Sequence, residues 1–131
     1  MKSLGFLSLL VLAVAGALST TECRAESTEQ MLSACRQIAD AKISGDTIEM
    51  DHTFDIGLCW GAFSVIQRLS ATVDHEMKPI LSSCAPSEST RTQLIAIYVR
   101  YAEKHPEKYH QDFVYTALSA MREAFPCPAK K

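Results

Sequence analysis

Residues 84–127, CAPSESTRTQLIAIYVRYAEKHPEKYHQDFVYTALSAMREAFPC, begin and end with a cysteine and have a helix-breaking His-Pro step in the middle. Thr90 and Gln93 have the spacing of a capping box, which predicts that a helix starts there. Pro106 disfavours a helix through the residue before it and suits the first turn of the next helix. Two helices joined by so short a corner should fold back as an αα-hairpin, with the two terminal cysteines close together.

Apolar residues at helical spacing support both helices and predict which faces are buried. The expected core faces are Leu94, Ile97, Tyr98, Tyr101 and Ala102 in the first helix, and Val114, Ala117, Leu118, Met121 and Phe125 in the second.

The N-terminal half also predicts two helices. Ser27 and Gln30 form another capping-box pattern, and Ser44-Gly45-Asp46 is a turn cluster that should follow the first of these helices. The second helix should run from about Thr53 to Val73. The expected core faces are Met31, Leu32, Cys35, Ile38 and Ala39 in the first helix, and Phe54, Leu58, Gly61, Val65, Leu69 and Val73 in the second.

The first 25 residues have the features of a secretory signal peptide: Lys2 is followed by an almost wholly apolar run to Leu18 and then by small residues. Cleavage after Ser19 and cleavage after Ala25 both fit. Cleavage after Ala25 removes Cys23 and leaves four cysteines, an even number that can pair fully in an oxidising compartment. We therefore expect a signal peptide in residues 1–25 and a single domain in residues 26–131 that reaches a periplasm-like space.

The four remaining cysteines, Cys35, Cys59, Cys84 and Cys127, allow three connectivities. Cys35 and Cys59 lie equal distances on either side of the turn near Thr47, so they would face each other in an antiparallel hairpin. Hairpin geometry thus favours 35–59 together with 84–127. The predicted fold is all-α: a small bundle of two disulfide-linked helical hairpins with four main helices, and room for one short extra helix in residues 74–83. Sustained strand alternation is absent from the sequence.

Nothing in the sequence favours an enzyme, a metal site or a cofactor. His105 and His110 are five residues apart and do not have the spacing of a helical zinc site. Paired cysteines cannot act as nucleophiles, and the sequence has neither a G-x-S-x-G motif nor a Gly-rich phosphate loop. The formal net charge of −2 argues against nucleic acid or an anionic membrane surface as the main partner.

A protein partner fits the sequence better. Residues 75–83 join the two hairpins, and loops held by rigid elements often carry binding function. The candidate contact residues are Glu76, Met77, Lys78, Ile80 and Leu81, with Tyr109 as a separate candidate because it falls off the apolar stripe and tyrosine is enriched at interfaces. The alternative is that the segment is an ordinary connector packed on the core.

Several elements of the C-terminal half come in the order seen in a known family. They are Cys84-x-Pro86, Thr90, Gln93-Leu94, Tyr101, His105-Pro106-Glu107, His110, Ala117-Leu118 and Phe125-Pro126-Cys127. These elements resemble the Tai/Rap immunity-protein domain. The resemblance implies a periplasmic, all-α, disulfide-bonded protein that binds and inhibits a secreted cell-wall amidase, an effector of the type VI secretion system, by pushing a loop into its active-site cleft. Relatives are often dimeric, so a homodimer stays open.

Two other functions remain compatible with the sequence. A small periplasmic stress chaperone would also be helical, secreted and cysteine-bearing, although two disulfides would resist the loosening that such a chaperone needs. An orphan domain that binds a different protein is the other alternative.

Overall fold

The computed structural model describes residues 26–44 and 47–128. The predicted signal peptide, including Cys23, lies outside the described residues, as do Gly45 and Asp46 of the predicted turn. Within the described part, the all-α prediction with four main helices is confirmed. The α-helices are α2 (Thr28–Ala39), α3 (Phe54–Ser70), α4 (Arg91–Lys104) and α5 (Phe113–Ala124).

The helix starts follow from local sequence. Both predicted capping boxes form, at Ser27 with Gln30 and at Thr90 with Gln93. The side chains of Thr53 and Asp112 accept backbone N–H groups at the starts of α3 and α5. These bonds satisfy amide groups that the first turn of a helix leaves without partners.

Two small elements differ from the prediction. A two-stranded antiparallel hairpin, β1 (Lys42–Ser44) with β2 (Thr47–Glu49), follows α2. Its strands have three residues each, too few for an alternation pattern to be recognised. The short extra helix is not in residues 74–83, which form turns; a 3₁₀ helix η1 (Pro106–Lys108) lies instead after the His-Pro step, with the proline in its first turn.

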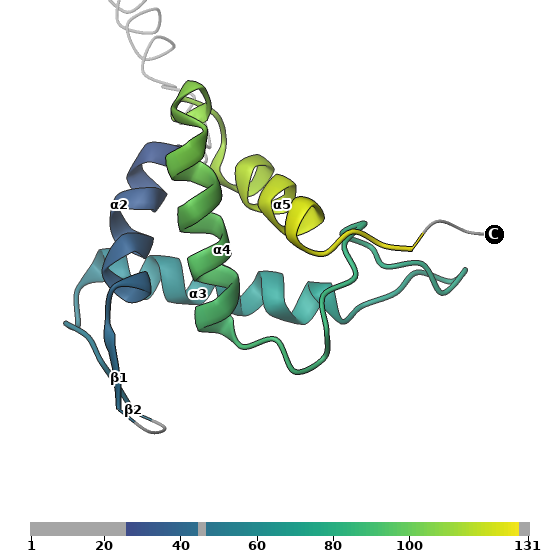
Figure 1. The fold of residues 1–131 in the computed structure, drawn as a ribbon, viewed down its shortest axis with the longest axis horizontal. Coiled ribbons are helices and arrows are strands. Elements are labelled where there is room, and N and C mark those ends of the chain that lie inside the picture. The colour runs from purple at the N-terminus through teal and green to yellow at the C-terminus, as the bar shows by residue number, and fades with distance from the viewer. Residues whose placement is uncertain (1–25, 45–46, 129–131) are drawn as a thin grey trace, which may run out of the picture.

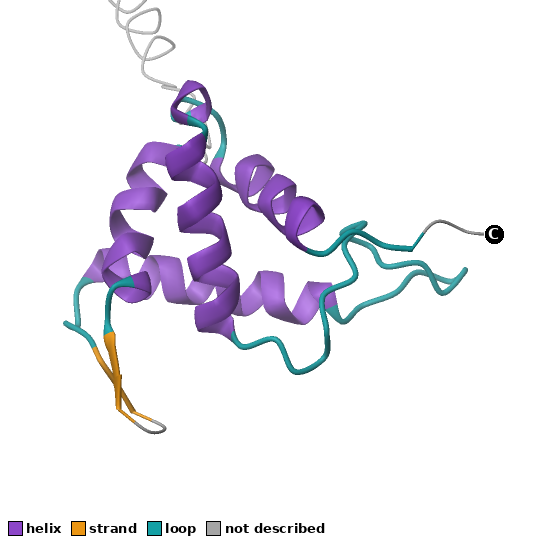
Figure 2. Cartoon of the chain, in the orientation of Figure 1, coloured by secondary structure: helices purple, strands orange, loops and turns teal. Residues whose placement is uncertain are grey.

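Figure 1 shows how the helices are arranged. α2 and α4 lie side by side and run in opposite directions, α3 crosses beneath them, and α5 leans against α4. Among the loops drawn in teal in Figure 2, the one between α3 and α4 projects furthest from the helices. The close antiparallel neighbour of α2 is therefore α4 and not α3. The predicted pairing of Cys35 with Cys59 is nevertheless confirmed, because the bridge joins α2 and α3. Cys84 and Cys127 also pair as predicted.

The core is built around three aromatic rings from three helices. Phe63, Tyr98 and Phe113 contact one another with ring centroids 5.4–5.8 Å apart. Two polar groups are buried beside them: the Thr28 hydroxyl donates to the Thr116 hydroxyl over 2.7 Å. Hydrogen bonding removes most of the cost of burying these hydroxyls.

The predicted buried face of α3 is wrong. Phe54, Val65 and Leu69 are exposed, and the helix instead buries Ile56, Cys59, Phe63 and Ile66. Apolar residues surround α3 almost completely, so helical spacing alone could not choose between its faces. In α5, Val114 is exposed, and Phe113, Thr116 and Ala120 are buried with Ala117 and Met121. The predicted faces of α2 and α4 largely hold: Met31, Leu32, Cys35, Ile38, Leu94, Tyr98, Tyr101 and Ala102 are buried.

Candidate partner-binding loop

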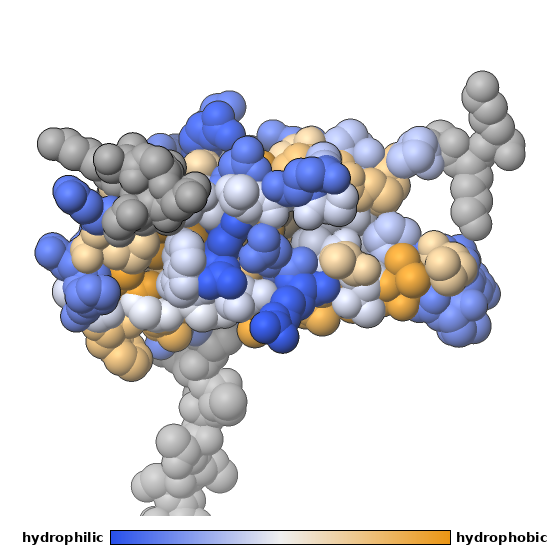
Figure 3. Space-filling view, turned by 90° about the horizontal axis from the view of Figure 1, so that it is seen from below, coloured by the Kyte–Doolittle hydropathy of each residue, from blue (hydrophilic) through white to orange (hydrophobic). Residues whose placement is uncertain are grey.

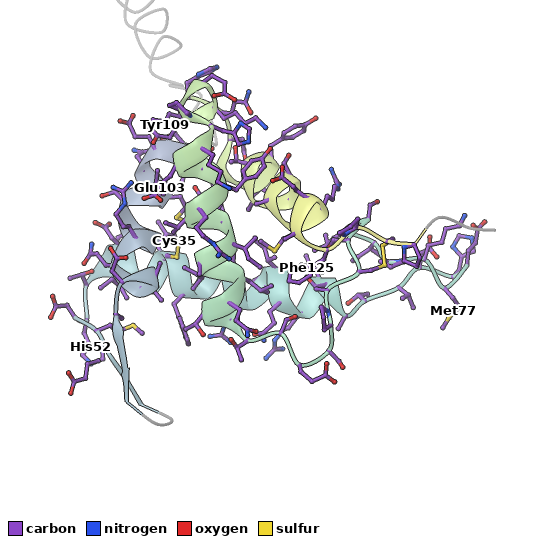
Figure 4. The ribbon with its side chains drawn as sticks, in the orientation of Figure 1. Cys35, His52, Met77, Glu103, Tyr109 and Phe125 are labelled. Carbon is purple, nitrogen blue, oxygen red and sulfur yellow. A yellow bond between two sulfur atoms is a disulfide. The ribbon has the colours of Figure 1, made fainter. Side chains whose placement is uncertain are left out.

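The segment that connects α3 to α4 (residues 71–90) projects away from the helices. Figure 1 shows it extending to one side of the molecule, beside the described segment that follows α5, and Figure 4 places Met77 at its far end. We call residues 72–80 the tip of this loop. Met77 is 77% exposed, which is unusual for a large apolar side chain.

The backbone of the tip is closed by its own hydrogen bonds. Asp74 N donates to Lys78 O over 2.8 Å, and Ile80 N donates to Thr72 O over 3.2 Å. Val73 and Pro79 form an isolated antiparallel bridge between these bonds. The tip is therefore a small hairpin with a defined shape, although it has no regular secondary structure.

The base of the loop is attached to α5 and to the segment that follows it. Arg122 Nε donates to Leu81 O over 3.0 Å, and Cys84 N donates to Phe125 O over 2.9 Å. The Cys84–Cys127 disulfide then links the two segments covalently, with a Cα–Cα distance of 4.9 Å. Leu81 is 8% exposed and belongs to the core. These contacts fix the direction in which the tip projects.

The structure brings together most of the predicted contact residues. Glu76, Met77, Lys78 and Ile80 are all exposed on the tip. Leu81 follows them but points into the core, so its role is to hold the loop in place.

Tyr109 does not belong to this group. It is half-buried against the core, and Figure 4 shows it beside the far end of α4, well separated from Met77.

Sequence reasoning missed two residues that shape the loop. Asp74 accepts backbone N–H groups within the tip, and Arg122 reaches the base from α5. Aspartate is common in turns. The position of Asp74 at the start of a segment that contains Pro79 could therefore have identified it as a turn-forming residue. No local signal connects Arg122 to a loop 41 residues away.

The charges around the loop do not suggest catalysis. The side chains of Glu76 and Lys78 form an ion pair across the tip. Glu88, further along the loop, has its pKa lowered because the Ser87 hydroxyl donates to its carboxylate. The pKa of Glu107, in η1, is lowered by a hydrogen bond from His105. In residues 26–44 and 47–128, no group of three or more His, Cys, Asp or Glu side chains is placed to hold a metal ion.

In a comparison with protein-family models, the model of the Rap1a immunity proteins matches residues 21–127. The chain belongs to the Rap1a immunity protein family. Neither the curated proteins nor the solved structures contain a match to it. Members of this family are inhibitors and not enzymes, and membership implies that the chain binds an effector protein.

Two further observations concern the described part of this Rap1a protein. Its two disulfides are typical of an oxidising compartment. Across the described ranges, no helix combines the length and the apolar character that a membrane span requires.

This Rap1a protein also exposes a second apolar surface, on the outer face of α3. Phe54 is 82% exposed, Val65 56% and Leu69 36%. Gly57 and Gly61 lie on the same face, and a Cβ atom added to either would meet nothing within 4 Å. Figure 3 shows hydrophobic surface both toward the end that carries the loop and toward the opposite end. Exposed apolar patches of this kind mark interaction sites in soluble proteins.

Proposed function

We propose that this protein is a periplasmic immunity protein that binds a peptidoglycan amidase delivered by a type VI secretion system. In this proposal the mature chain is residues 26–131, and the tip of the α3–α4 loop enters the active-site cleft of the amidase. The inhibition is steric: the loop occupies the space that the peptide stem of the cell wall would otherwise fill.

The observation that carries this proposal is the shape of the loop. A cleft is blocked best by a projection that has the same conformation before and after binding, because less conformational entropy is then lost on association. The tip has backbone hydrogen bonds on both sides of its turn, and its base is fixed by a disulfide and by Arg122. An exposed Met77 at its end offers an apolar side chain to the partner.

The compartment follows from the target. An amidase that cuts the cell wall acts in the periplasm, so its inhibitor must be secreted there. The signal-peptide features of residues 1–25 and the paired cysteines both support this location.

A toxicity-rescue assay in a heterologous bacterium tests the proposal. A candidate amidase from the same gene neighbourhood is directed to the periplasm with and without the immunity protein. We expect growth to be restored by the full chain and not by a chain that lacks residues 1–25. Met77→Asp, which places a charge at the tip, should abolish rescue.

Val114→Asp provides the matched control because Val114 is also exposed, at 47%, but lies on α5. It should rescue as well as the wild type. Rescue by Met77→Asp at normal protein levels would contradict the role of the loop. Failure of the wild type to rescue would favour an orphan domain with a different partner.

We also propose that two copies of the chain associate through the outer face of α3. The two most distant exposed apolar residues of this face are arranged symmetrically about the point between Gly61 and Ala62: Phe54 and Leu69 are equally far from it. Exposed Val65 lies on one side of this point, and half-buried Leu58 lies equally far on the other. An antiparallel second copy would therefore bring Phe54 of one chain near Leu69 of the other. Two glycines near the crossing would allow the helices to approach closely.

The molar mass in solution tests this association. Val65→Glu should convert a dimer to a monomer in sedimentation experiments, because it places a charge in the apolar contact. Val114→Glu, an equally simple change on α5, should leave the dimer intact. A wild-type chain that stays monomeric at high micromolar concentration would refute the association and leave the amidase proposal untouched.

A further inference from the structure

We propose that Asp74 is the positioning residue of the tip, which it holds so that Met77 is presented as a preformed apolar anchor. This inference rests on the proposed function for what the anchor enters. The hydrogen bonds that carry it belong to the free protein, so the role of Asp74 is testable without any partner.

Asp74 accepts three consecutive backbone N–H groups of the tip. Its carboxylate Oδ1 accepts from Glu76 N over 2.8 Å and from Lys78 N over 2.9 Å. Its backbone carbonyl accepts from Met77 N over 3.0 Å. Hydrogen bonds to an ionised carboxylate are stronger than those to a neutral group. A single half-buried residue thus satisfies the amides around the apex.

The backbone of Met77 shows why such a clamp is needed. Its φ of 61° lies in the left-handed region. A residue with a side chain adopts this region only when the surrounding structure holds it there. In the tip, that holding comes from the bonds to Asp74 on each side of Met77. Without them, the apex would relax into several conformations and Met77 would lose its fixed direction.

The side chains beside Met77 indicate what kind of surface it meets. The carboxylate of Glu76 pairs with the Lys78 ammonium group, so the two charges next to the apex largely cancel. The Asp74 carboxylate faces backbone amides. The His75 side chain, which is 89% exposed, lies with its Nε2 3.9 Å from the same Glu76 carboxylate. The apolar group at the apex is the thioether side chain of Met77, which is flexible and suits an irregular apolar hollow. We therefore assign to the partner an apolar pocket, and not an ion-pairing site, at this position.

Amide hydrogen exchange in the free protein tests the clamp. In Asp74→Ala, the protection factors of the Glu76 and Lys78 amides should fall by about tenfold or more, because each loses its acceptor. Asp74→Asn keeps an amide oxygen and should give an intermediate loss.

Asp112→Ala is the matched control, because Asp112 also accepts a backbone amide, Val114 N at 2.7 Å, but does so at the start of α5. It should change the tip amides by less than about twofold, as expected for sites that share no partners. Equal protection of the tip amides in the wild type and in Asp74→Ala would overturn the proposal.

Two variants of Met77 then test the anchor by binding to the amidase. Met77→Gly fits the left-handed backbone and removes only the side chain, so tip protection should persist while affinity falls by at least about tenfold. Met77→Leu keeps an apolar side chain and should retain affinity within a few-fold. Strong binding by Met77→Gly would overturn the anchor. If no variant and no wild-type chain binds the amidase, the proposed function fails, whereas the exchange result still decides the role of Asp74.

Discussion

The Cys35–Cys59 bridge lies in the centre of the core with both cysteines fully buried, whereas the Cys84–Cys127 bridge lies at the surface with both cysteines exposed. Around the first bridge, helices pack through aromatic and aliphatic side chains. Around the Cys84–Cys127 bridge, the α3–α4 loop contacts the segment that follows α5, and few side chains are buried there; Leu81 and Ser83 are two of them. One disulfide therefore lies within a packed core, and the other joins two exposed segments.

This contrast separates the part of the chain that creates stability from the part that we propose as a binding surface. The inner region would remain close-packed around its bridge through hydrophobic burial. The outer region buries little and depends on hydrogen bonds and on its crosslink for its shape. In the proposed function this loop inserts into another protein, so it has to stay exposed and cannot be stabilised by burial.

Removing each bridge in turn is the strongest test of this contrast. Chain entropy alone predicts losses in the free energy of unfolding of about 3.5 kcal/mol for the inner bridge and about 4 kcal/mol for the outer one, since the sequence separations are 24 and 43 residues. Burial reverses this order: the pair Cys35→Ala and Cys59→Ala also leaves a cavity, which adds about 1–3 kcal/mol. We expect the inner double variant to be the less stable in urea unfolding.

The outer double variant, Cys84→Ala with Cys127→Ala, serves as the comparison. It should keep the near-ultraviolet circular dichroism of the aromatic core while losing protection of the amides near the base of the loop. If the outer variant is the less stable of the two, loop entropy outweighs burial and the contrast between the two regions fails.

Much of the fold could be predicted because its signals are local. The capping boxes at Ser27 and Thr90 and the stop at Pro106 each depend on residues within a few positions. The face of α3 could not be read from spacing, because apolar residues surround that helix. The predicted disulfide at Cys59 was enough to identify the buried face of α3. Residues 56, 63 and 66 lie on the same face as Cys59 at helical spacing, whereas Phe54 and Val65 do not. A covalent constraint is better evidence for a buried face than an apolar stripe.

A second test compares one apolar truncation in each region. Phe63→Ala removes a fully buried ring that contacts Tyr98 and Phe113, and it should lower the free energy of unfolding by about 3–5 kcal/mol. Met77→Ala removes a side chain that is 77% exposed and should change it by no more than about 0.5 kcal/mol. Chemical denaturation of both variants measures the difference.

The binding assay should reverse the order of these two variants. At a temperature where both are folded, Met77→Ala should bind the amidase more weakly than Phe63→Ala, because only Met77 lies on the tip. A large loss of stability in Met77→Ala would mean that the tip contributes to folding, against the separation proposed here.

The candidate site was less predictable than the fold. Its location in residues 75–83 followed from the position of the segment between two disulfide-linked units, and the structure does place Glu76, Met77, Lys78 and Ile80 on one exposed tip. The burial of Leu81 could not be foreseen, because it depends on contacts with the distant core and on Arg122. Tyr109 was a separate candidate, and its distance from the loop could not be predicted either, because tyrosine enrichment at interfaces says nothing about where a residue lies in space.

The smallest expected effect concerns one hydroxyl in the inner region. Tyr98 is fully buried, and its hydroxyl donates to Thr28 O over 3.0 Å. Burial raises the pKa of Tyr98 well above its ordinary value of 10.0, with a smaller contribution from Tyr109. The neutral phenol is favoured in the folded state, so the stability it contributes is present below pH 10 and is lost as the pH rises toward the folded-state pKa.

Tyr98→Phe should cost about 1 kcal/mol at pH 7 and make the decline in the free energy of unfolding above pH 10 shallower. Tyr115→Phe, which alters a side chain that is 71% exposed, should change neither quantity. Equal declines in the wild type and in Tyr98→Phe would show that the buried phenol does not govern the alkaline limit of the inner region.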